Sequence, residues 1–421
     1  MAKNNIKCHV CKEGAVRSVE GYGNFSQVTS DCKLWRGKNS ICVCELCGSV
    51  QKAINRKWEK EISKIYDTYS IYYQSNGIEQ AVYDRNSGKA FARSERVLRH
   101  VKKKMRLGKS GKYLDVGCGN GSALRSFIGL LPLWKLAGTE LNDRYKKNIE
   151  GISGKPRLYT CSLKDIRGKF DLITLFHALE HVVDPISFLN EARNKLTSGG
   201  VLVIDIPNYI QNPFDLFIAD HCTHFTLQTV RYVLLKAGFT TLDINTDLIP
   251  REMVIIARAA KKFEMLKADN CGGKVCAKSS SCDSVVSALA WVKKFLGKAV
   301  EVARQDNFGI FGTSIIATWL MDTVGTRVKF FVDEDPERRG KTYMNLPIYH
   351  PQDIPKCGNV FFALPFDMAK EVRKRLYRTG IKLYLPPRLN YNDLFLEKHI
   401  FVSMWISKDY CETAGLKTKM R

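Results

Sequence analysis

The middle of the chain shows an alternation of short apolar runs and longer stretches with helical spacing. The apolar run at 113–116 predicts a buried strand, and the apolar spacing over 122–131 predicts a helix. Strands that alternate with helices in this way predict an α/β fold with a mainly parallel sheet. The further strands are expected at 134–141, 157–160, 170–176, 200–208, 240–245 and 252–258, with helices at 185–196 and 226–239 and a Thr-Ser-Gly-Gly turn at 197–200.

A second, smaller unit of the same kind is predicted further along the chain. A long helix over 285–305 is followed by a strand, a glycine turn and a helix within 308–321. The next strand ends at Asp333. The turn has the single glycine Gly312 where a dinucleotide fingerprint has three, so we do not expect a dinucleotide there.

Composition narrows the class of protein. The chain has 421 residues, of which 45% are hydrophobic and 26% charged, as in ordinary globular proteins. It has no apolar run of about 18 residues and no signal-peptide pattern at its start. Fourteen cysteines in such a chain predict thiols and metal sites in a reducing compartment, and we expect a cytoplasmic protein.

The net charge of +24 is spread along the chain. A diffuse positive excess favours anionic partners such as nucleotides, nucleotide-sugars or nucleic acid. It is equally compatible with a simple solubility feature, so charge alone does not indicate nucleic-acid binding.

The N-terminal segment contains two Cys-x-x-Cys pairs. Four thiolates at this spacing can bind one tetrahedral zinc ion, as in zinc ribbons, and no histidine or carboxylate suggests an open catalytic position. Cys32 and Cys42 lie between the pairs, but only Cys44 completes the two-residue spacing. We therefore predict a structural zinc site at Cys8, Cys11, Cys44 and Cys47. Cys271, Cys276 and Cys282 are irregularly spaced and are expected to be plain linker residues.

The turn after the first strand predicts the cofactor. Gly117, Gly119 and Gly121 leave room for a ligand, but Ser122 stands where a dinucleotide fingerprint has its third glycine. Asp115, at the end of the strand, would repel a pyrophosphate and suits a ligand with an ammonium group and no phosphate. S-adenosylmethionine is such a ligand.

The next strand ends contain groups suited to the rest of that cofactor. Glu140 follows the second strand, where an acid can accept both ribose hydroxyls. Ser162 and the backbone of Leu163 are placed to meet the adenine edge, and His177 ends the fourth strand at the rim of the cleft.

These motifs resemble those of class I S-adenosylmethionine-dependent methyltransferases, on the residues "LDVGCGNG", "GTEL", "FDLITLFHALEHVVDP" and "SGGVLVIDIPN". More narrowly, the chain is similar to three-part sugar C-methyltransferases. That resemblance implies a class I Rossmann-like sheet with a zinc-ribbon-like module before it and a second Rossmann-like α/β domain behind it. The expected parts are a zinc-binding module with a connecting helix (1–75), a methyltransferase domain (76–260), a linker (261–284) and a C-terminal domain (285–421) that closes the cleft, helps to hold a nucleotide or dimerises.

The same resemblance implies a catalytic role for His221. It matches the histidine of a Glu-His pair that removes a proton next to a sugar ketone, work to which a histidine is suited. In this chain Asp220 takes the place of the glutamate, and His224 stands where those enzymes have tyrosine. Glu180 and His181, after the fourth strand, are further candidate catalytic residues.

Two other interpretations of these histidines remain open. His177, Glu180, His181 and a later histidine resemble the pattern by which small-RNA 2′-O-methyltransferases bind a divalent ion, although those enzymes have glutamate at the first position. Plain structural hydrogen bonding is the other.

The expected function is methyl transfer to a nucleotide-activated keto sugar or related anionic sugar in polysaccharide or glycoside biosynthesis. The alternative is O-methylation of a sugar or RNA hydroxyl. A small-molecule acceptor is favoured over nucleic acid, and the expected state is a monomer or homodimer without a membrane span.

Overall fold

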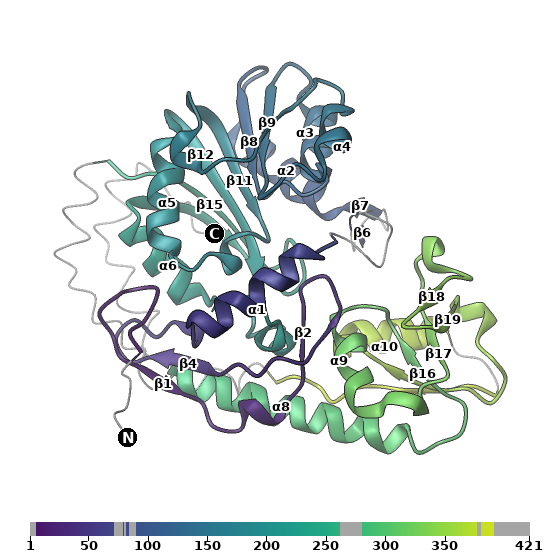
Figure 1. The fold of residues 1–421 in the computed structure, drawn as a ribbon. Coiled ribbons are helices and arrows are strands. Elements are labelled where there is room, and N and C mark those ends of the chain that lie inside the picture. Colours follow the sequence, from purple (N-terminus) through teal and green to yellow (C-terminus); the bar gives the residue numbers. More distant parts are fainter. Residues whose placement is uncertain are drawn as a thin grey trace, which may run out of the picture.

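The computed structural model describes residues 6–70, 79, 81–83, 90–261, 280–376 and 380–390. Its largest sheet has seven strands in the order β10-β9-β8-β11-β12-β15-β14 (Figure 1). The neighbouring strands β10, β9, β8, β11 and β12 are parallel to one another. The mixed α/β class is therefore confirmed. These strands are β8 Lys112–Val116, β9 Lys135–Thr139, β10 Arg157–Tyr159, β11 Phe170–Phe176, β12 Leu196–Pro207, β14 Phe239–Asn245 and β15 Glu252–Ala259.

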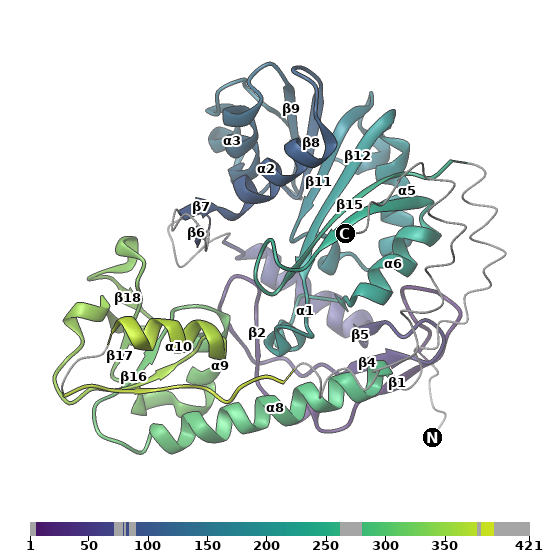
Figure 2. The same ribbon diagram turned by 180° about the vertical axis from the view of Figure 1, so that it is seen from behind.

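Helices cover both faces of this sheet, because successive strand residues point to opposite sides. Tyr113 packs with α2 and α3 in one apolar cluster, whereas its neighbour Leu114 packs with α5 and α6 in another. Both views show this arrangement (Figures 1 and 2). The helices are α2 Arg93–Met105, α3 Ser122–Leu130, α4 Lys146–Glu150, α5 Pro185–Asn194 and α6 Leu227–Lys236. A two-stranded ribbon, β6 Ala81–Tyr83 with β7 Ala90–Ala92, precedes α2.

The turn predicted at 197–200 lies inside β12. Phe170 of β11 pairs with Leu196, yet Leu172 pairs with Val201, so β12 has extra residues at this point of the ladder. Gly200 lies against the backbone of Phe170, where a Cβ would be 2.9 Å from the Phe170 carbonyl oxygen. The Ser-Gly-Gly sequence therefore makes a bulge within a strand, not a turn before one.

The N-terminal segment forms a four-stranded sheet in the order β1-β4-β5-β13. Its last strand, β13 Thr223–His224, comes from the segment 208–226 between β12 and α6 and pairs with β5. We call this segment the acceptor loop, because the resemblance to sugar C-methyltransferases implies that its His221 acts on the acceptor. The division predicted at residue 75 therefore does not separate two independent sheets. The remaining elements here are β1 Val16–Ser18, β2 Gln27–Val28, β3 Leu34–Trp35, β4 Ile41–Cys44, β5 Val50–Lys52 and α1 Arg56–Asp67.

The C-terminal part contains a second sheet of the same type, in the order β18-β19-β17-β16-β20-β21. It is parallel except at β18. Its elements are α8 Ser280–Val302, β16 Phe308–Phe311, α9 Ile315–Val324, β17 Phe330–Val332, β18 Thr342–Tyr343, β19 Leu346–Tyr349, β20 Asn359–Phe362, α10 Phe366–Arg375 and β21 Lys382–Tyr384.

The helix predicted from 285 begins at Ser280, so Cys282 lies in α8 and not in a linker. Cys271 and Cys276 lie outside the described residues. In both views α8 runs from beside β1 and β4 to the C-terminal sheet (Figures 1 and 2).

One apolar core joins the three parts. Tyr22 of the N-terminal segment, Phe217 of the acceptor loop and Trp319 of α9 belong to a single buried cluster. The Trp319 indole also donates a hydrogen bond to the Ser26 carbonyl, 2.8 Å away. The C-terminal sheet is thus fixed to the N-terminal module. No helix among the residues described is long and apolar enough to cross a membrane.

A substitution at Gly309 of β16 tests the packing of the C-terminal sheet. A Cβ at this position would overlap the ring of Phe330 on β17, and this ring is buried in the core and has little room to move away. Gly309→Ala should therefore destabilise the fold by about 1–3 kcal/mol in urea unfolding, as overpacked cores do. The matched control is Gly297→Ala at an exposed position of α8, where a Cβ meets nothing within 4 Å. That change should be neutral or stabilising, and an equal loss in both variants would contradict the packing argument.

Candidate functional site

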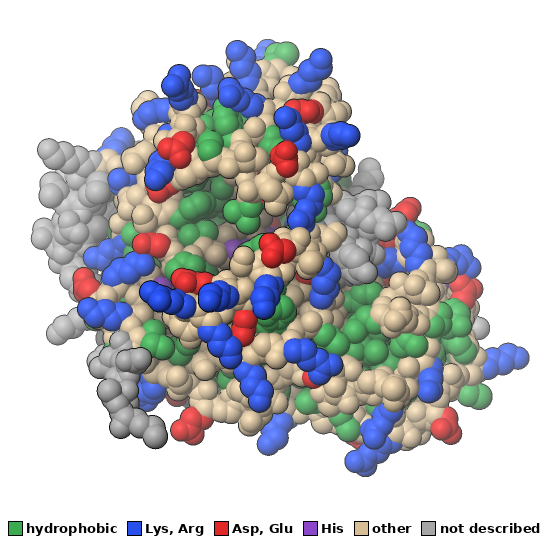
Figure 3. Space-filling model, in the orientation of Figure 1, with side chains coloured by type: hydrophobic (Ala, Val, Ile, Leu, Met, Phe, Trp, Pro, Cys, Tyr) green, Lys and Arg blue, Asp and Glu red, His purple; other side chains and the backbone are tan. Residues whose placement is uncertain are grey.

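A cavity of about 830 Å³ lies where the three parts of the chain meet. Figure 3 shows this side of the molecule, with histidine visible inside a hollow and lysine and arginine side chains spread over the surrounding surface. Its lining includes Ser30, Tyr66, Arg93, Gly117, Glu140, Ser162, Leu163, His177, His181, Asp215, His221, Glu252, Thr313, Ser314 and Arg338. One wall is therefore the carboxyl edge of the large sheet, and the opposite wall belongs to the C-terminal sheet.

The glycine turn after β8 has the conformation that the sequence predicts. Gly117, Gly119 and Gly121 have φ values of 72°, 53° and 85°, which favour glycine. The Gly119 N–H donates to Glu140 Oε1 at 2.5 Å, and the Leu141 N–H donates to Oε2 at 3.1 Å. Of the three glycines only Gly117 lines the cavity, so Gly119 and Gly121 shape the turn and orient Glu140.

Asp115 lies beneath the turn and does not line the cavity. Its carboxylate accepts a hydrogen bond of 2.6 Å from the Thr174 hydroxyl on β11, and only 2% of the residue is exposed. Burial raises its pKa to about 7, against the effect of the Thr174 hydrogen bond. The structure thus gives Asp115 a partner within the sheet, where the sequence suggested a cofactor ammonium.

Ser162, Leu163 and His177 all line the cavity on the side of Glu140. His177 has a φ of 48°, a conformation that non-glycine residues rarely adopt. Its Nδ1 lies 3.1 Å from Glu180 Oε1, and its Nε2 lies 3.2 Å from Glu252 Oε1. Burial and Arg93 oppose a charge on this ring, but the two glutamates outweigh them and raise the pKa of His177 to about 10.

His177 belongs to a charged cluster whose other members the sequence did not reveal. Arg93 Nη1 lies 2.8 Å from His177 Nε2 and 3.2 Å from Glu252 Oε1. Asp205 of β12 is fully buried beside Glu252, and burial together with that neighbour raises the pKa of Asp205 well above its usual range. Ligand atoms of His177, Asp205 and Glu252 lie within 4.8 Å of one another. Arg93 already provides a cation at this position.

The acceptor loop contains a carboxylate shared by two histidines. Asp215 Oδ1 lies 2.8 Å from His221 Nδ1, and Oδ2 lies 2.7 Å from His224 Nδ1. His221 lines the cavity, whereas His224 is fully buried behind Asp215 and does not. Asp215 is therefore a site residue that sequence reasoning missed, and His224, which stands where the similar enzymes have tyrosine, does not line the cavity.

This arrangement shifts the pKa values of the two imidazoles in opposite directions. Burial opposes a charge on His221, but Asp215 outweighs it and raises its pKa above the ordinary 6.5. Burial prevails at His224 and lowers its pKa to about 4. The pKa of Asp215 itself stays well below its usual range in spite of burial, because both histidines interact with its ionised form.

The remaining candidates surround His221. The rings of His181 and His221 meet edge to face with centroids 4.7 Å apart. His181 Nδ1 lies 3.0 Å from the Tyr66 hydroxyl and 3.5 Å from Asp220 Oδ2. The Asp220 carboxylate mainly accepts from Ser30 of the N-terminal module, at 2.8 Å from its N–H and 2.5 Å from its hydroxyl. Asp220 is thus fully buried and joins the loop to the module.

Glu180, like Asp220, does not line the cavity. It is only 1% exposed. Its Oε1 already lies 3.1 Å from His177 Nδ1. One potential ligand atom from each of Glu180, His181 and His221 lies within 4.8 Å of the others. These three side chains could hold a divalent ion.

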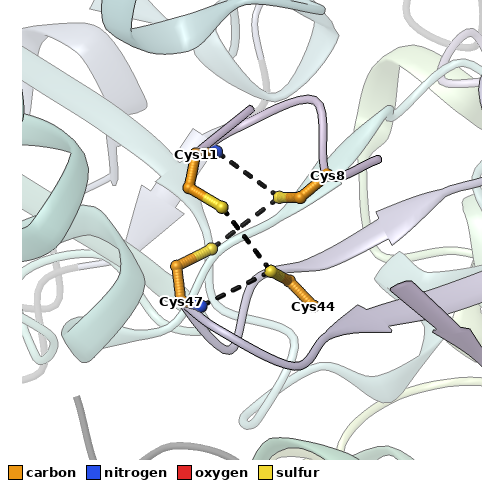
Figure 4. A group of neighbouring side chains, drawn as sticks. All are labelled: Cys8, Cys11, Cys44 and Cys47. Atoms are coloured by element: carbon orange, nitrogen blue, oxygen red, sulfur yellow. Dashed lines mark hydrogen bonds between the residues drawn. The ribbon is translucent and has the colours of Figure 1, made fainter. Parts of the chain in front are cut away.

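The four predicted zinc ligands form one cluster (Figure 4). Cys8 and Cys47 sulfurs are 3.8 Å apart, and those of Cys11 and Cys44 are 3.7 Å apart. Tetrahedral Zn–S bonds of about 2.3 Å require sulfurs about 3.8 Å apart, so the geometry fits such an ion. Backbone N–H groups point at the sulfurs of Cys8, Cys11 and Cys44, as they do around thiolates.

Comparison with known proteins identifies the central part of the chain. Residues 90–244 match a family model described as a methyltransferase domain. With the Rossmann-like sheet described above, this shows that the central part of the chain is a methyltransferase domain. The search of curated proteins finds no match.

Solved structures with related folds include an S-adenosylmethionine-dependent methyltransferase from Clostridium acetobutylicum, with 16% identity, a TM-score of 0.34, and coverage of 49% of this chain and 98% of that one. A complex of a Haloferax volcanii putative methyltransferase with its Trm112 activator matches with 14% identity, a TM-score of 0.36, and coverage of 40% and 91%. An O-methyltransferase of neocarzinostatin biosynthesis matches with 17% identity, a TM-score of 0.32, and coverage of 35% and 49%, so the chain spans about half of its length.

A substitution of Glu140 tests whether S-adenosylmethionine binds at this end of the cavity. Its two oxygens are oriented by the N–H groups of Gly119 and Leu141 and keep lone pairs for ribose hydroxyls. Glu140→Ala should weaken binding of S-adenosylmethionine by about 1.5–3 kcal/mol in calorimetry, the usual value of a charged acceptor. The control is Glu150→Ala, an exposed glutamate of α4 that does not line the cavity. Unchanged affinity in Glu140→Ala would show that the ribose does not bind here.

Proposed function

We propose that this methyltransferase transfers a methyl group to a carbon atom of a nucleotide-activated keto sugar or a related anionic sugar, with His221 as general base. The observation that carries the proposal is the Asp215–His221 pair, which lines the same cavity as Glu140 and the glycine turn. The resemblance to sugar C-methyltransferases, stated above from the sequence, supports the same chemistry.

The residues present fit S-adenosylmethionine, which supplies an electrophilic methyl group when bound. Glu140 would accept the ribose hydroxyls, and Ser162 with Leu163 would meet the adenine. Gly117, without a side chain, leaves the backbone open to the ligand. Its Cβ would lie 3.3 Å from that of Ala178, so a larger residue would also crowd the start of the loop that follows β11.

On the acceptor side, His221 would remove the proton next to the ketone. Asp215 binds Nδ1, which fixes the ring and leaves Nε2 as the nitrogen that can take the proton. Asp215 also stabilises the imidazolium that results. The carbanion so formed, delocalised onto the ketone oxygen, would accept the methyl group that the bound cofactor supplies, and the sulfonium would leave as a neutral thioether.

The opposite wall supports an anionic acceptor. The N-terminus of α9 faces the cavity through Thr313 and Ser314, and Ser314 makes no side-chain cap to this helix. A helix N-terminus of this kind favours a phosphate group. Arg338 lines the cavity beside Thr313, and its guanidinium lies 3.0 Å from Asp333. A diphosphate between the two sheets would place the attached sugar toward His221.

A second candidate is metal-assisted O-methylation of a sugar or RNA hydroxyl. It is favoured by the proximity of Glu180, His181 and His221, whose ligand atoms lie within 4.8 Å. A histidine whose other nitrogen binds a carboxylate, like His221 with Asp215, is a common arrangement around metals. The two candidates differ in their sensitivity to chelators.

His221→Ala should lower the methylation rate by about 10²–10⁴, the usual contribution of a positioned base. Cofactor affinity should stay close to wild type, because His221 belongs to the acceptor loop. The wild-type rate should rise with pH above 6.5, because the base acts in its neutral form and Asp215 raises its pKa. Nucleotide-linked keto sugars should be assayed first in D₂O, where base action alone exchanges the proton next to the ketone, and then with the cofactor.

The matched control is His100→Ala. His100 also pairs with an aspartate, Asp243, at 3.1 Å, but it does not line the cavity. Turnover of His221→Ala at the wild-type rate would refute the base assignment. Loss of wild-type activity with a chelator, while the cysteine cluster keeps its metal, would support metal-assisted O-methylation instead.

We also assign zinc to the cysteine cluster, at one ion per chain. Cys44→Ser with Cys47→Ser should abolish zinc binding in metal analysis and expose the N-terminal module to protease, because binding energy in such sites is largely folding energy. Cys161→Ser, at an exposed cysteine outside the cluster, should change neither. Absence of zinc in wild-type protein expressed with zinc available would contradict the assignment.

A further inference from the structure

His9 lies inside the first Cys-x-x-Cys pair, between Cys8 and Cys11. Its side chain is buried, and its Nε2 lies 2.7 Å from the hydroxyl of Thr223, the first residue of β13 and the second after His221. The other ring nitrogen, Nδ1, has no hydrogen-bond partner among the described residues. In the described part of the chain, the hydrogen bonding of this ring therefore joins the cysteine cluster to the acceptor loop.

The cysteine sulfurs fix the position of His9. The Cys11 N–H donates a hydrogen bond of 3.4 Å to the Cys8 sulfur (Figure 4), and the Gly14 N–H donates one of 3.3 Å to the Cys11 sulfur. The backbone on both sides of His9 is thus folded around these two sulfurs. Because binding energy in such sites is largely folding energy, a metal ion that holds the sulfurs also sets where the imidazole lies.

The second cysteine pair is joined to the same strand of the acceptor loop. β5 begins three residues after Cys47 and pairs with β13. Gln51 of β5 lies opposite Thr223, and its side-chain oxygen lies 3.2 Å from the Cys8 sulfur. β13 is therefore held by the first pair through His9 and by the second pair through β5.

Other parts of the site have supports that do not involve the cysteines. Asp220 accepts hydrogen bonds from Ser30, and the Ala219 N–H donates to the Val28 carbonyl at 2.7 Å. On the proposed cofactor side, Glu140 is oriented by the glycine turn after β8. The direct contacts of the two cysteine pairs with the acceptor loop are thus concentrated on β13.

We propose that the cysteine cluster is a metal-dependent control of the acceptor site, with His9 as a positioning residue. Metal occupancy holds His9 and β5 in place, and these in turn hold β13 and the histidines that share Asp215. Loss of the metal releases the acceptor side, while the cofactor side still binds its ligand. This inference rests on the proposed zinc assignment and on the proposed role of His221.

The test is amide hydrogen exchange of the full chain, measured by mass spectrometry before and after a chelator removes the metal. Exchange in residues 221–225 should become about tenfold faster or more in the metal-free protein, because β13 loses its supports and opens locally. Exchange in β8 should not change, and calorimetry should give an unchanged affinity for S-adenosylhomocysteine. Addition of zinc alone should restore slow exchange.

Equal exchange in residues 221–225 with and without the metal would overturn the proposal. A rise of the same size in β8 would overturn it as well, because the metal would then stabilise the whole chain and not the acceptor side.

Two variants separate the contact of His9 from the metal itself. Thr223→Val keeps the shape of the side chain but removes the hydroxyl, and His9→Leu removes the imidazole. Zinc content should stay at one per chain in both, and exchange in residues 221–225 should rise about fivefold, as for one lost hydrogen bond. Thr223→Ser, which keeps the hydroxyl, should behave like wild type. Glu13→Ala, at an exposed position of the same segment, is the control.

Wild-type exchange in Thr223→Val would overturn the role of His9, even if the metal-free protein or His9→Leu failed to fold. Faster exchange in Thr223→Ser than in Thr223→Val would indicate packing alone and would overturn it too. No acceptor is needed, so failure to methylate any nucleotide-sugar would end the proposed function and leave this result intact. Wild-type protein without zinc would end the zinc assignment and this inference together.

Discussion

The buried charge of Asp215 is the constraint on which the arrangement of this site depends. A carboxylate with about 1% of its surface exposed is unfavourable unless other groups compensate it. Its hydrogen-bond partners, His221 and His224, come from the same loop a few residues later, which forces this loop to fold back on itself. Lys52 of the N-terminal module donates to the carbonyl of Leu216, the residue after Asp215. The loop therefore folds around this carboxylate and is fixed to the module at the same place.

This coupling means that the two sides of the proposed site have separate supports. The proposed cofactor side rests on the large parallel sheet, where Glu140 is oriented by the backbone of the glycine turn. The proposed acceptor side rests on the N-terminal sheet, which takes β13 as its edge strand, and on the core shared with α9. A change in the module would thus alter the acceptor loop and leave the cofactor turn intact. The C-terminal sheet, fixed to the same module through Trp319, keeps its helix N-terminus opposite the loop.

Features with a local sequence pattern were predictable. The strands of the large sheet, the cysteine pairs and the glycine turn each carry their signal within a few residues, and the structure contains all of them. The ladder irregularity near Gly200 was not predictable, because a Ser-Gly-Gly sequence serves a turn or a bulge equally well. Asp115 was expected to face a ligand. In the structure its partner is Thr174 on a neighbouring strand, and the local sequence does not identify a contact of this kind.

The site residues that escaped prediction depend on distant partners. Asp215 lies in "NPFDLF", which has no motif, and becomes significant only when two histidines fold onto it. Asp205 and Glu252 come from adjacent antiparallel strands, and Arg93 reaches them from a helix more than a hundred residues earlier in the chain. A lysine such as Lys52 is expected at the surface on composition alone. Its burial follows from the pairing of β5 with β13, which joins segments far apart in the sequence.

The sharing of Asp215 also explains why two adjacent histidines differ in their chemistry. One carboxylate can compensate one imidazolium, and a second protonated ring beside it would meet both the first ring and Lys52. His224, without a hydrogen-bond partner for Nε2 among the described residues, has no other group to stabilise its charge. It therefore stays neutral and acts as a fixed donor to Asp215 through Nδ1. A proton that enters the group is held on His221, the ring that lines the cavity, as the proposed base role requires.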